Sequence, residues 1–243
     1  MIYDGPFSDH IYQQQPRALE GQSTFPESFA RNALTQLSGV SEIRLAGETG
    51  GSMPCYQFAG DSFTAAVSKQ GGKVVYFLHS RPLGEAKLSL EQALERGDAV
   101  MRESGLGEFA YRYYSLNNGV LAINYAAVQD GVTLYPDQVK VQVSMDSGRV
   151  VGAECSQYLA NHTRRTDVTP TVTAAQAREM VSPKLTIRSE RLCVIPLDAG
   201  EALCWGFSCT DGAADYWVFV NAKSGETEQL LRVIATEQGE AAM

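Results

Sequence analysis

Residues Tyr135–Gly152, YPDQVKVQVSMDSGRVVG, carry the pattern that decides the fold of this chain. Apolar and polar side chains alternate from Val139 to Met145, which is the period of two expected of a strand with one buried face. Asp146-Ser147-Gly148 follows as a turn, because Asp can bond its own backbone and Gly tolerates a positive φ. The chain then returns through Arg149-Val150-Val151, so the whole stretch predicts an antiparallel hairpin.

The same hairpin pattern occurs three times in the sequence. It is present in Phe63–Leu78 around Gln70-Gly71-Gly72, and again in Tyr216–Leu231 around Lys223-Ser224-Gly225. The turn glycines therefore stand at 72, 148 and 225, which are 76 and 77 residues apart. Recurrence at a fixed spacing predicts three copies of one structural unit.

A predicted helix precedes each hairpin. Each of these helices opens with the Ser/Thr-x-x-Glu/Gln pattern of a capping box, which begins at Thr24, Ser89 and Thr173. Two further strands separate each helix from its hairpin, which predicts an α+β fold of three tandem units, each with one helix packed on a four-stranded antiparallel sheet. The expected boundaries are an N-terminal arm at 1–22 and units at 23–86, 87–168 and 169–243.

The composition limits the classes of function. Of the 243 residues, 44% are hydrophobic and 20% are charged, which is typical of a folded protein. The net charge of −8 argues against nucleic acid as the main partner, because phosphate binding needs a basic surface. No apolar run approaches the roughly 20 residues of a membrane span, and no signal peptide is expected at the start.

The five cysteines favour packing over metal binding. They stand at 55, 155, 193, 204 and 209, without a Cys-x-x-Cys pair, and the three histidines stand at 10, 79 and 162. We therefore expect no zinc site and no redox motif. Reduced thiols that act as small core residues are the favoured interpretation, and one disulfide within the third unit is the alternative.

A catalytic site is not predicted. Ser8, Asp9 and His10 are the residue types of a catalytic triad, but adjacent positions in a turn cannot normally form a relay, and no Gly-x-Ser-x-Gly elbow is present. Glu201 with Asp198 is an acidic pair that we place in a loop, without a pocket to raise a pKa. No phosphate-binding loop or histidine metal motif occurs either, so we expect no enzyme activity, cofactor or metal.

Two polar segments outside the repeated core are the candidate partner contacts. One is the N-terminal arm, and the other is Asn161–Arg165, which can be a solvated loop, a joint between units or an anion site. The residues selected from them are Phe7, Asp9, His10, His162, Arg164 and Arg165. Edge strands of the predicted sheets are further candidates, because they can accept an added strand.

The capped helix followed by strands that end in a Gly-centred hairpin resembles the PepSY module. Nearly the whole chain is similar to the C-terminal part of the YpeB-type spore germination proteins, which carry three such modules. The residues behind this resemblance are Tyr3-Asp4-Gly5-Pro6-Phe7-Ser8-Asp9-His10, Tyr135-Pro136-Asp137-Gln138-Val139-Lys140-Val141, Gly148-Arg149-Val150-Val151-Gly152, Tyr158 with His162 and Arg165, and Asn221-Ala222-Lys223-Ser224-Gly225-Glu226.

The resemblance implies a non-catalytic protein that a SleB-type cortex-lytic hydrolase needs for its stability or deposition. It also implies that the protein lies outside the cytoplasm, at the spore inner membrane and cortex. PepSY modules are also associated with restraining peptidases, so an inhibitor of a secreted peptidase is the alternative, and a peptidoglycan hydrolase is a third hypothesis. Family members carry an N-terminal membrane anchor. Because this sequence lacks one, the resemblance implies a part of a longer protein, attached to a membrane only through that anchor.

Overall fold

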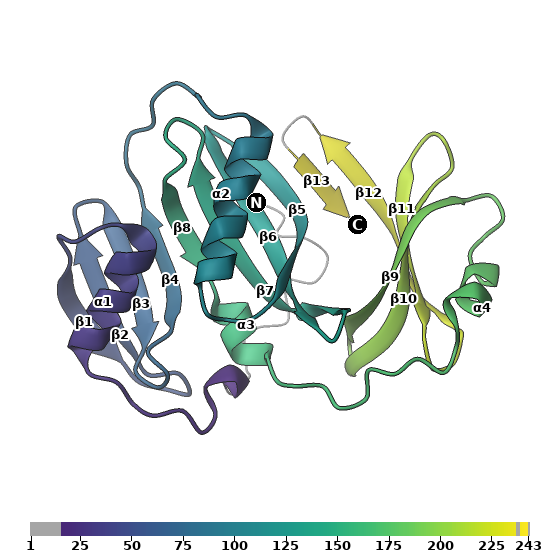
Figure 1. Ribbon diagram of the computed structural model, residues 1–243, viewed down its shortest axis with the longest axis horizontal. Coiled ribbons are helices and arrows are strands. Elements are labelled where there is room, and N and C mark those ends of the chain that lie inside the picture. Colours follow the sequence, from purple (N-terminus) through teal and green to yellow (C-terminus); the bar gives the residue numbers. More distant parts are fainter. Residues whose placement is uncertain (1–15, 237–238, 243) are drawn as a thin grey trace.

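The computed structural model describes residues 16–236 and 239–242. It is an α+β fold in which most elements are strands of one sheet, with a few helices packed beside it (Figure 1). The helical segments are η1 (Arg17–Leu19), α1 (Glu27–Ser38), α2 (Leu90–Glu103), α3 (Ser156–Asn161) and α4 (Ala174–Glu179). The strands are β1 (Arg44–Thr49), β2 (Cys55–Gly60), β3 (Phe63–Ser68), β4 (Val74–His79), β5 (Phe109–Asn117), β6 (Val120–Gln129), β7 (Val132–Ser144), β8 (Val150–Glu154), β9 (Thr186–Leu197), β10 (Gly200–Thr210), β11 (Asp215–Asn221), β12 (Thr227–Thr236) and β13 (Gly239–Ala242).

The four-stranded groups expected from the sequence share one sheet. Its order is β1-β2-β3-β4-β8-β7-β6-β5-β13-β12-β11-β10-β9. The first two groups join where β4 pairs with β8, with Phe77 opposite Ala153. A lone four-stranded sheet would leave the backbone N–H and C=O groups of both edge strands without partners. Pairing one edge strand with that of the next group gives these groups hydrogen bonds. Four strands follow α1 and four follow α2, while five strands, β9 to β13, follow α4.

The predicted capping boxes have different outcomes. The boxes at Ser89 and Thr173 are confirmed, since both their side-chain and their backbone hydrogen bonds are present. The box at Thr24 is wrong: α1 begins after Pro26, and no side chain caps it. Thr24 forms a β-bridge with Gln70 instead, which holds this backbone extended and delays the start of the helix.

Each longer helix packs an apolar stripe of side chains against the sheet. In the first group, Ala30 and Leu34 of α1 are fully buried against Phe58, Phe63 and Phe77. In the second, α2 lies so close that a Cβ added at Gly97 would come within 2.5 Å of Ile123 and Tyr125. A residue without a side chain is therefore needed where α2 crosses the sheet.

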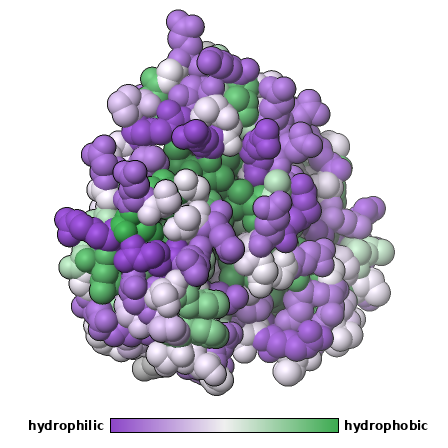
Figure 2. Space-filling model, turned by 60° about the vertical axis from the view of Figure 1, so that its left-hand side comes forward, coloured by the Kyte–Doolittle hydropathy of each residue, from purple (hydrophilic) through white to green (hydrophobic). Residues whose placement is uncertain are grey.

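A groove of about 480 Å³ lies between α1 and α2. Its lining is largely apolar and includes Phe29, Leu37, Val100, Met101 and Val141. On the face seen in Figure 2, hydrophobic side chains gather in the middle and hydrophilic residues surround them. Joining two helix-covered groups in one sheet therefore leaves apolar side chains accessible between the helices.

The cysteines are core residues, as predicted. All five are buried and none forms a disulfide. Cys204 and Cys209 belong to different core clusters, and the cluster of Cys209 includes Ala177 of α4. Side chains five positions apart on one regular strand face opposite sides, which agrees with this separation.

Two elements were not predicted from the sequence. The helix α3 has six residues and no side-chain cap, so it lacks the usual start signal. The strand β13 pairs with β12 and also meets β5, with Gly239 opposite Ser115. It thereby connects the third group of strands to the second. The unit boundaries given above stay a prediction.

Candidate functional site

The strand β7 changes its pairing half-way along. Gln138 pairs with Ala126 of β6, but Leu134 pairs with Ala127, the very next residue. Residues 135–137 are therefore left out of the ladder, as in an enlarged β-bulge. Such bulges redirect side chains, and here the bulge turns Asp137 out of the regular ladder, toward the segment that follows α3.

Before the bulge, β7 also contacts the third group of strands. Thr133 and Leu134 pair in parallel with Cys193 and Val194 of β9. This is the only parallel pairing among the described strands. The bulge consequently lies at the place where two groups of strands meet.

Asp137 is the centre of a charged cluster at this place. Its side chain is fully buried, and Nη2 of Arg165 lies 2.7 Å from its Oδ1. Nδ1 of His162 lies 2.6 Å from its Oδ2, which Arg165 also contacts through Nη1. Asn161 donates to the carbonyl oxygen of Pro136 over 2.8 Å. The segment after α3 therefore closes over the bulge.

The same arginine reaches a second strand. Nη2 of Arg165 lies 2.8 Å from Oε1 of Glu201 in β10, and its Nε donates to Oε2 over 3.1 Å. Burial lowers the pKa of Arg165, but the hydrogen bonds to Glu201 and Asp137 outweigh it, so this pKa is raised. The guanidinium stays charged and holds β7, β10 and the loop after α3 together. We name Asp137, His162, Arg165 and Glu201 the Asp137 junction.

An aromatic ring supports the histidine of the junction. The ring of Tyr158 in α3 stacks on His162 with centroids 4.5 Å apart. Its hydroxyl donates to the carbonyl oxygen of Leu106 over 2.6 Å. Burial, with a contribution from Asp137, raises the pKa of Tyr158 to about 12, so the hydroxyl remains protonated and keeps donating.

The Asp137 junction contains a histidine and two carboxylates, but their contacts hold segments of the chain together and do not form a catalytic arrangement. Within the part of the chain that the structure describes, no hydroxyl or thiol is hydrogen-bonded to His162. A nucleophile activated by a histidine needs such contact. No group of three or more His, Cys, Asp or Glu side chains in residues 16–236 and 239–242 could hold a metal ion.

Comparison with known proteins decides the family. The family model for YpeB sporulation, PepSY1 and PepSY2 domains, matches residues 1–167. The chain belongs to the YpeB sporulation family. Of the sequences named sporulation protein YpeB, that of Halalkalibacterium halodurans is 29% identical over 172 residues, covering 70% of this chain and 38% of that protein. That of Bacillus subtilis is 27% identical over 167 residues, covering 68% and 37%.

A solved structure of this family has the same fold. The Bacillus megaterium YpeB C-terminal domain matches 87% of this chain and 99% of its own length with a TM-score of 0.79, at 20% identity. The sequence matches to the two YpeB proteins span less than two fifths of their length. In the described part of this YpeB-family chain, no helix is both long and apolar enough to cross a membrane.

A second clamp of the YpeB-family chain joins the first group of strands to the second. Arg81, which follows β4, donates Nη1 to Oδ2 of Asp146 over 3.0 Å, and the amide of Gly84 donates to the same oxygen over 2.9 Å. Asp146 lies in the turn of the opening hairpin. The expectation that it bonds its own backbone there is wrong, because Arg81 and Gly84 take its oxygens. The hydrogen bond from Arg81 lowers its pKa.

The structure brings together only part of the predicted contact residues of this YpeB-family chain. His162 and Arg165 meet at the Asp137 junction, while Arg164 is 75% exposed and pairs with the exposed Asp130. Phe7, Asp9 and His10 lie outside the described residues. That any of the six contacts a partner stays a prediction.

Sequence reasoning did not find the carboxylates of the junction. Glu201, which the sequence pattern places in a loop, lies in β10. Asp137 belongs to the Tyr-Pro-Asp-Gln string that supports the family resemblance, and Pro136 within a predicted strand was a signal for a bulge.

Proposed function

We propose that this chain is a non-catalytic binding and stabilising protein of spore germination, which a SleB-type cortex-lytic hydrolase needs for its stability or deposition. The observation that carries the proposal is the match of residues 1–167 to the YpeB sporulation family. The same proposal puts the protein outside the cytoplasm, at the spore inner membrane and cortex.

The three groups, each a helix followed by four or five strands, are tandem PepSY-like units in this proposal. Their element order supports it, as do the capping boxes at Ser89 and Thr173. The clamps hold neighbouring groups in place through a fully buried carboxylate at Asp137 and a half-buried one at Asp146. A protein built in this way offers a stiff surface to a partner, which reduces the entropy lost on binding.

The strand β1 is the surface that we assign to the partner. It ends the sheet and pairs only with β2 among the described strands. Its Leu45 is 40% exposed. An edge strand presents unpaired backbone groups that can accept a strand from another chain.

A capture experiment with the purified hydrolase encoded in the same genome tests the function and the surface together. The wild-type chain is expected to bind the hydrolase and to slow its digestion by an added protease. Leu45→Lys is expected to weaken binding, because an edge lysine disfavours strand addition. Leu78→Lys is the matched control, since Leu78 is 45% exposed but lies in β4, between β3 and β8.

The result that contradicts the function is a hydrolase that neither binds the chain nor survives longer in its presence. Equal binding by both lysine variants and the wild type would remove β1 as the surface and leave the function standing.

The edge position of β1 also favours a second function, that of a PepSY-type inhibitor of a secreted peptidase. An exposed sheet edge can pair with an extended segment of a peptidase by strand addition. A panel of secreted peptidases assayed with and without the chain tests this function. Slower substrate turnover that Leu45→Lys relieves would support it, and unchanged turnover across the panel would exclude it.

A further inference from the structure

Arg112 is a buried cation at a bulge in β5. Tyr111 pairs with Tyr125 of β6 and Tyr113 pairs with Asn124, so Arg112 is the extra residue between them. A bulge of this kind redirects a side chain away from the regular ladder. Only 9% of Arg112 is exposed.

The described surroundings of Arg112 contain no opposite charge that pairs with it. Its Nε donates to the carbonyl oxygen of Tyr111 over 2.8 Å, and Nη1 lies 3.4 Å from the hydroxyl oxygen of Tyr135. Both acceptors are neutral, and no salt bridge joins Arg112 to a residue in the described part of the chain. Arg165, the other strongly buried arginine, has two carboxylates. A buried charge without a counter-charge is costly, which points to an anion that completes the site.

Aromatic rings connect Arg112 to a second arginine. The guanidinium of Arg112 lies 5.5 Å from the ring centre of Tyr135, whose ring meets that of Trp217 edge to face at 5.9 Å. The guanidinium of Arg191 in turn lies 5.8 Å from the ring centre of Trp217. In the described part of the chain Arg191 has no salt bridge either. The two cations therefore flank one set of rings.

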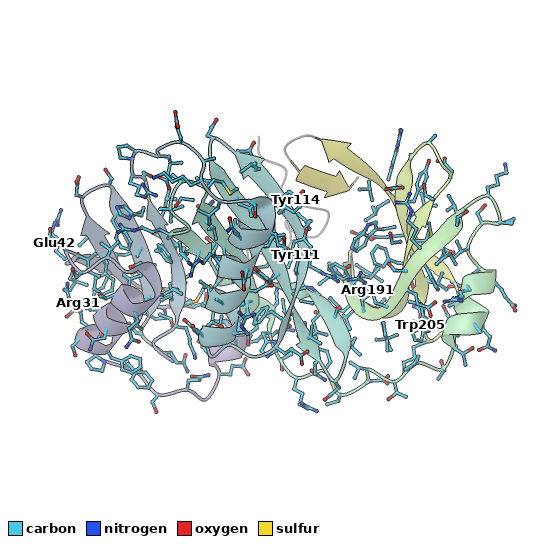
Figure 3. All side chains as sticks on the ribbon, turned by 45° about the horizontal axis from the view of Figure 1, so that its top comes forward. Arg31, Glu42, Tyr111, Tyr114, Arg191 and Trp205 are labelled. Carbon is cyan, nitrogen blue, oxygen red and sulfur yellow. The ribbon has the colours of Figure 1, made fainter. Side chains whose placement is uncertain are left out.

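This cluster lies where the second and third groups of strands face each other. Figure 3 shows Tyr111 and Tyr114 at β5, with Arg191 on the opposite side of the space between the two halves of the sheet. The rings of Tyr111 and Tyr114 stack with centroids 6.5 Å apart. Aromatic faces and arginine forks are the groups that hold an extended peptide and fix its charged side chains.

We propose that Arg112, Arg191, Tyr135 and Trp217 form a binding site for a carboxylate carried by a peptide segment. We name it the arginine–aromatic site. The free N–H donors of Arg112 match the two oxygens of one carboxylate, and the rings accept an apolar neighbour of the acidic residue. Of the two arginines only Arg112 is buried, and one buried cation suits a singly charged group better than a phosphate. This inference does not depend on which protein the chain serves.

The experiment uses the whole chain and two probes, N-acetyl-Phe-Asp-amide and its Asn counterpart. Titration calorimetry is expected to show that the Asp peptide binds at least tenfold more tightly than the Asn peptide. Arg112→Gln is expected to lower the affinity for the Asp peptide by about tenfold or more, because a hydrogen bond between charged groups is lost. Arg191→Gln, at a half-buried position, provides a second variant if Arg112→Gln does not fold.

Arg44→Gln is the matched control, because Arg44 is exposed on β1. It is expected to bind both probes as the wild type does. The thermal unfolding of every variant is recorded, so that a loss of binding is not confused with a loss of folding.

The carboxylate can come from another protein or from this chain itself, which carries Asp4 and Asp9. The double variant Asp4→Asn/Asp9→Asn is therefore titrated in parallel. Binding of the Asp probe to the wild type indicates an external source, while binding to the double variant alone indicates the chain's own carboxylate. The proposal is overturned if neither form binds the Asp probe more tightly than about 1 mM, or if the Asn probe binds equally well.

Discussion

Arg165 and Asp137 are 28 positions apart in the sequence, yet Nη2 of Arg165 lies 2.7 Å from Oδ1 of Asp137, whose side chain is fully buried. The same guanidinium bonds Glu201. Because Asp137 is completely buried, its charge depends on these contacts and on His162. Removing one partner of a buried ion pair lowers the free energy of unfolding more than removing one partner of an exposed ion pair.

Arg165→Gln is expected to lower the free energy of unfolding by about 3 kcal/mol, because it leaves Asp137 buried with less compensation. Urea denaturation measures this loss. Arg164→Gln is the control from the neighbouring position, where both partners are exposed, and is expected to cost less than about 0.5 kcal/mol. Equal, small losses for the two variants would show that the Asp137 junction does not hold the sheet together.

Asp146 is expected to make the protein sensitive to acid. Arg81 lowers its pKa in the folded state. An unfolded Asp has a pKa of about 3.9, so below that pH the unfolded state binds more protons than the folded state. The contribution of Asp146 to the free energy of unfolding therefore begins to fall near pH 4 and is lost progressively as the pH drops toward the lowered pKa of the folded state. Asp146→Asn is therefore expected to show a smaller loss of stability between pH 6 and pH 3.

Urea titrations at the two pH values measure this difference. Glu42→Gln, which alters an exposed carboxylate, is the control and should keep the slope of the wild type. If Asp146→Asn keeps that slope as well, the clamp between Arg81 and Asp146 contributes nothing to the acid sensitivity.

The capping boxes provide a matched pair of substitutions. Ser89→Ala is expected to lower the free energy of unfolding by about 1 kcal/mol, because the Ser89 hydroxyl accepts a hydrogen bond from the backbone amide of Gln92. Thr24→Ala removes the same sequence motif but no cap, since α1 begins after Pro26, and is expected to change stability by less than about 0.5 kcal/mol. Thermal unfolding compares the two. A loss at Thr24 as large as that at Ser89 would mean that Thr24 caps α1 in solution.

The cysteines are expected to react slowly in the folded protein. Burial raises the pKa of Cys155 and of Cys204 to about 12, so at pH 8 on the order of one thiol in ten thousand is the reactive thiolate. Iodoacetamide should label few thiols of the native chain. After unfolding in guanidinium it should label all five. Mass spectrometry of the intact chain counts the adducts. Fewer than five adducts on the unfolded chain without reductant would reveal a disulfide.

The candidate site was predictable only in part. The local charge of Asn161–Arg165 marked His162 and Arg165, but not their partners, because Asp137 and Glu201 are 28 and 36 positions away from Arg165. The bulge that turns Asp137 out of the ladder lies directly after the parallel pairing of β7 with β9. Pairing between distant strands leaves no periodic trace in a sequence.

The amino-acid sequence by itself determined the hairpins, the helices that precede them and the two working capping boxes. These depend on side-chain alternation, on glycine in turns and on hydrogen bonds within a few residues, all of which are local. The tertiary structure alone decided that the strand groups join through β4 and β8, and that β7 reaches β9. It also decided where Arg165 finds Asp137 and where Arg112 is left without a carboxylate, because burial and strand neighbours, and hence the cost of each charge, arise only when distant segments pack together.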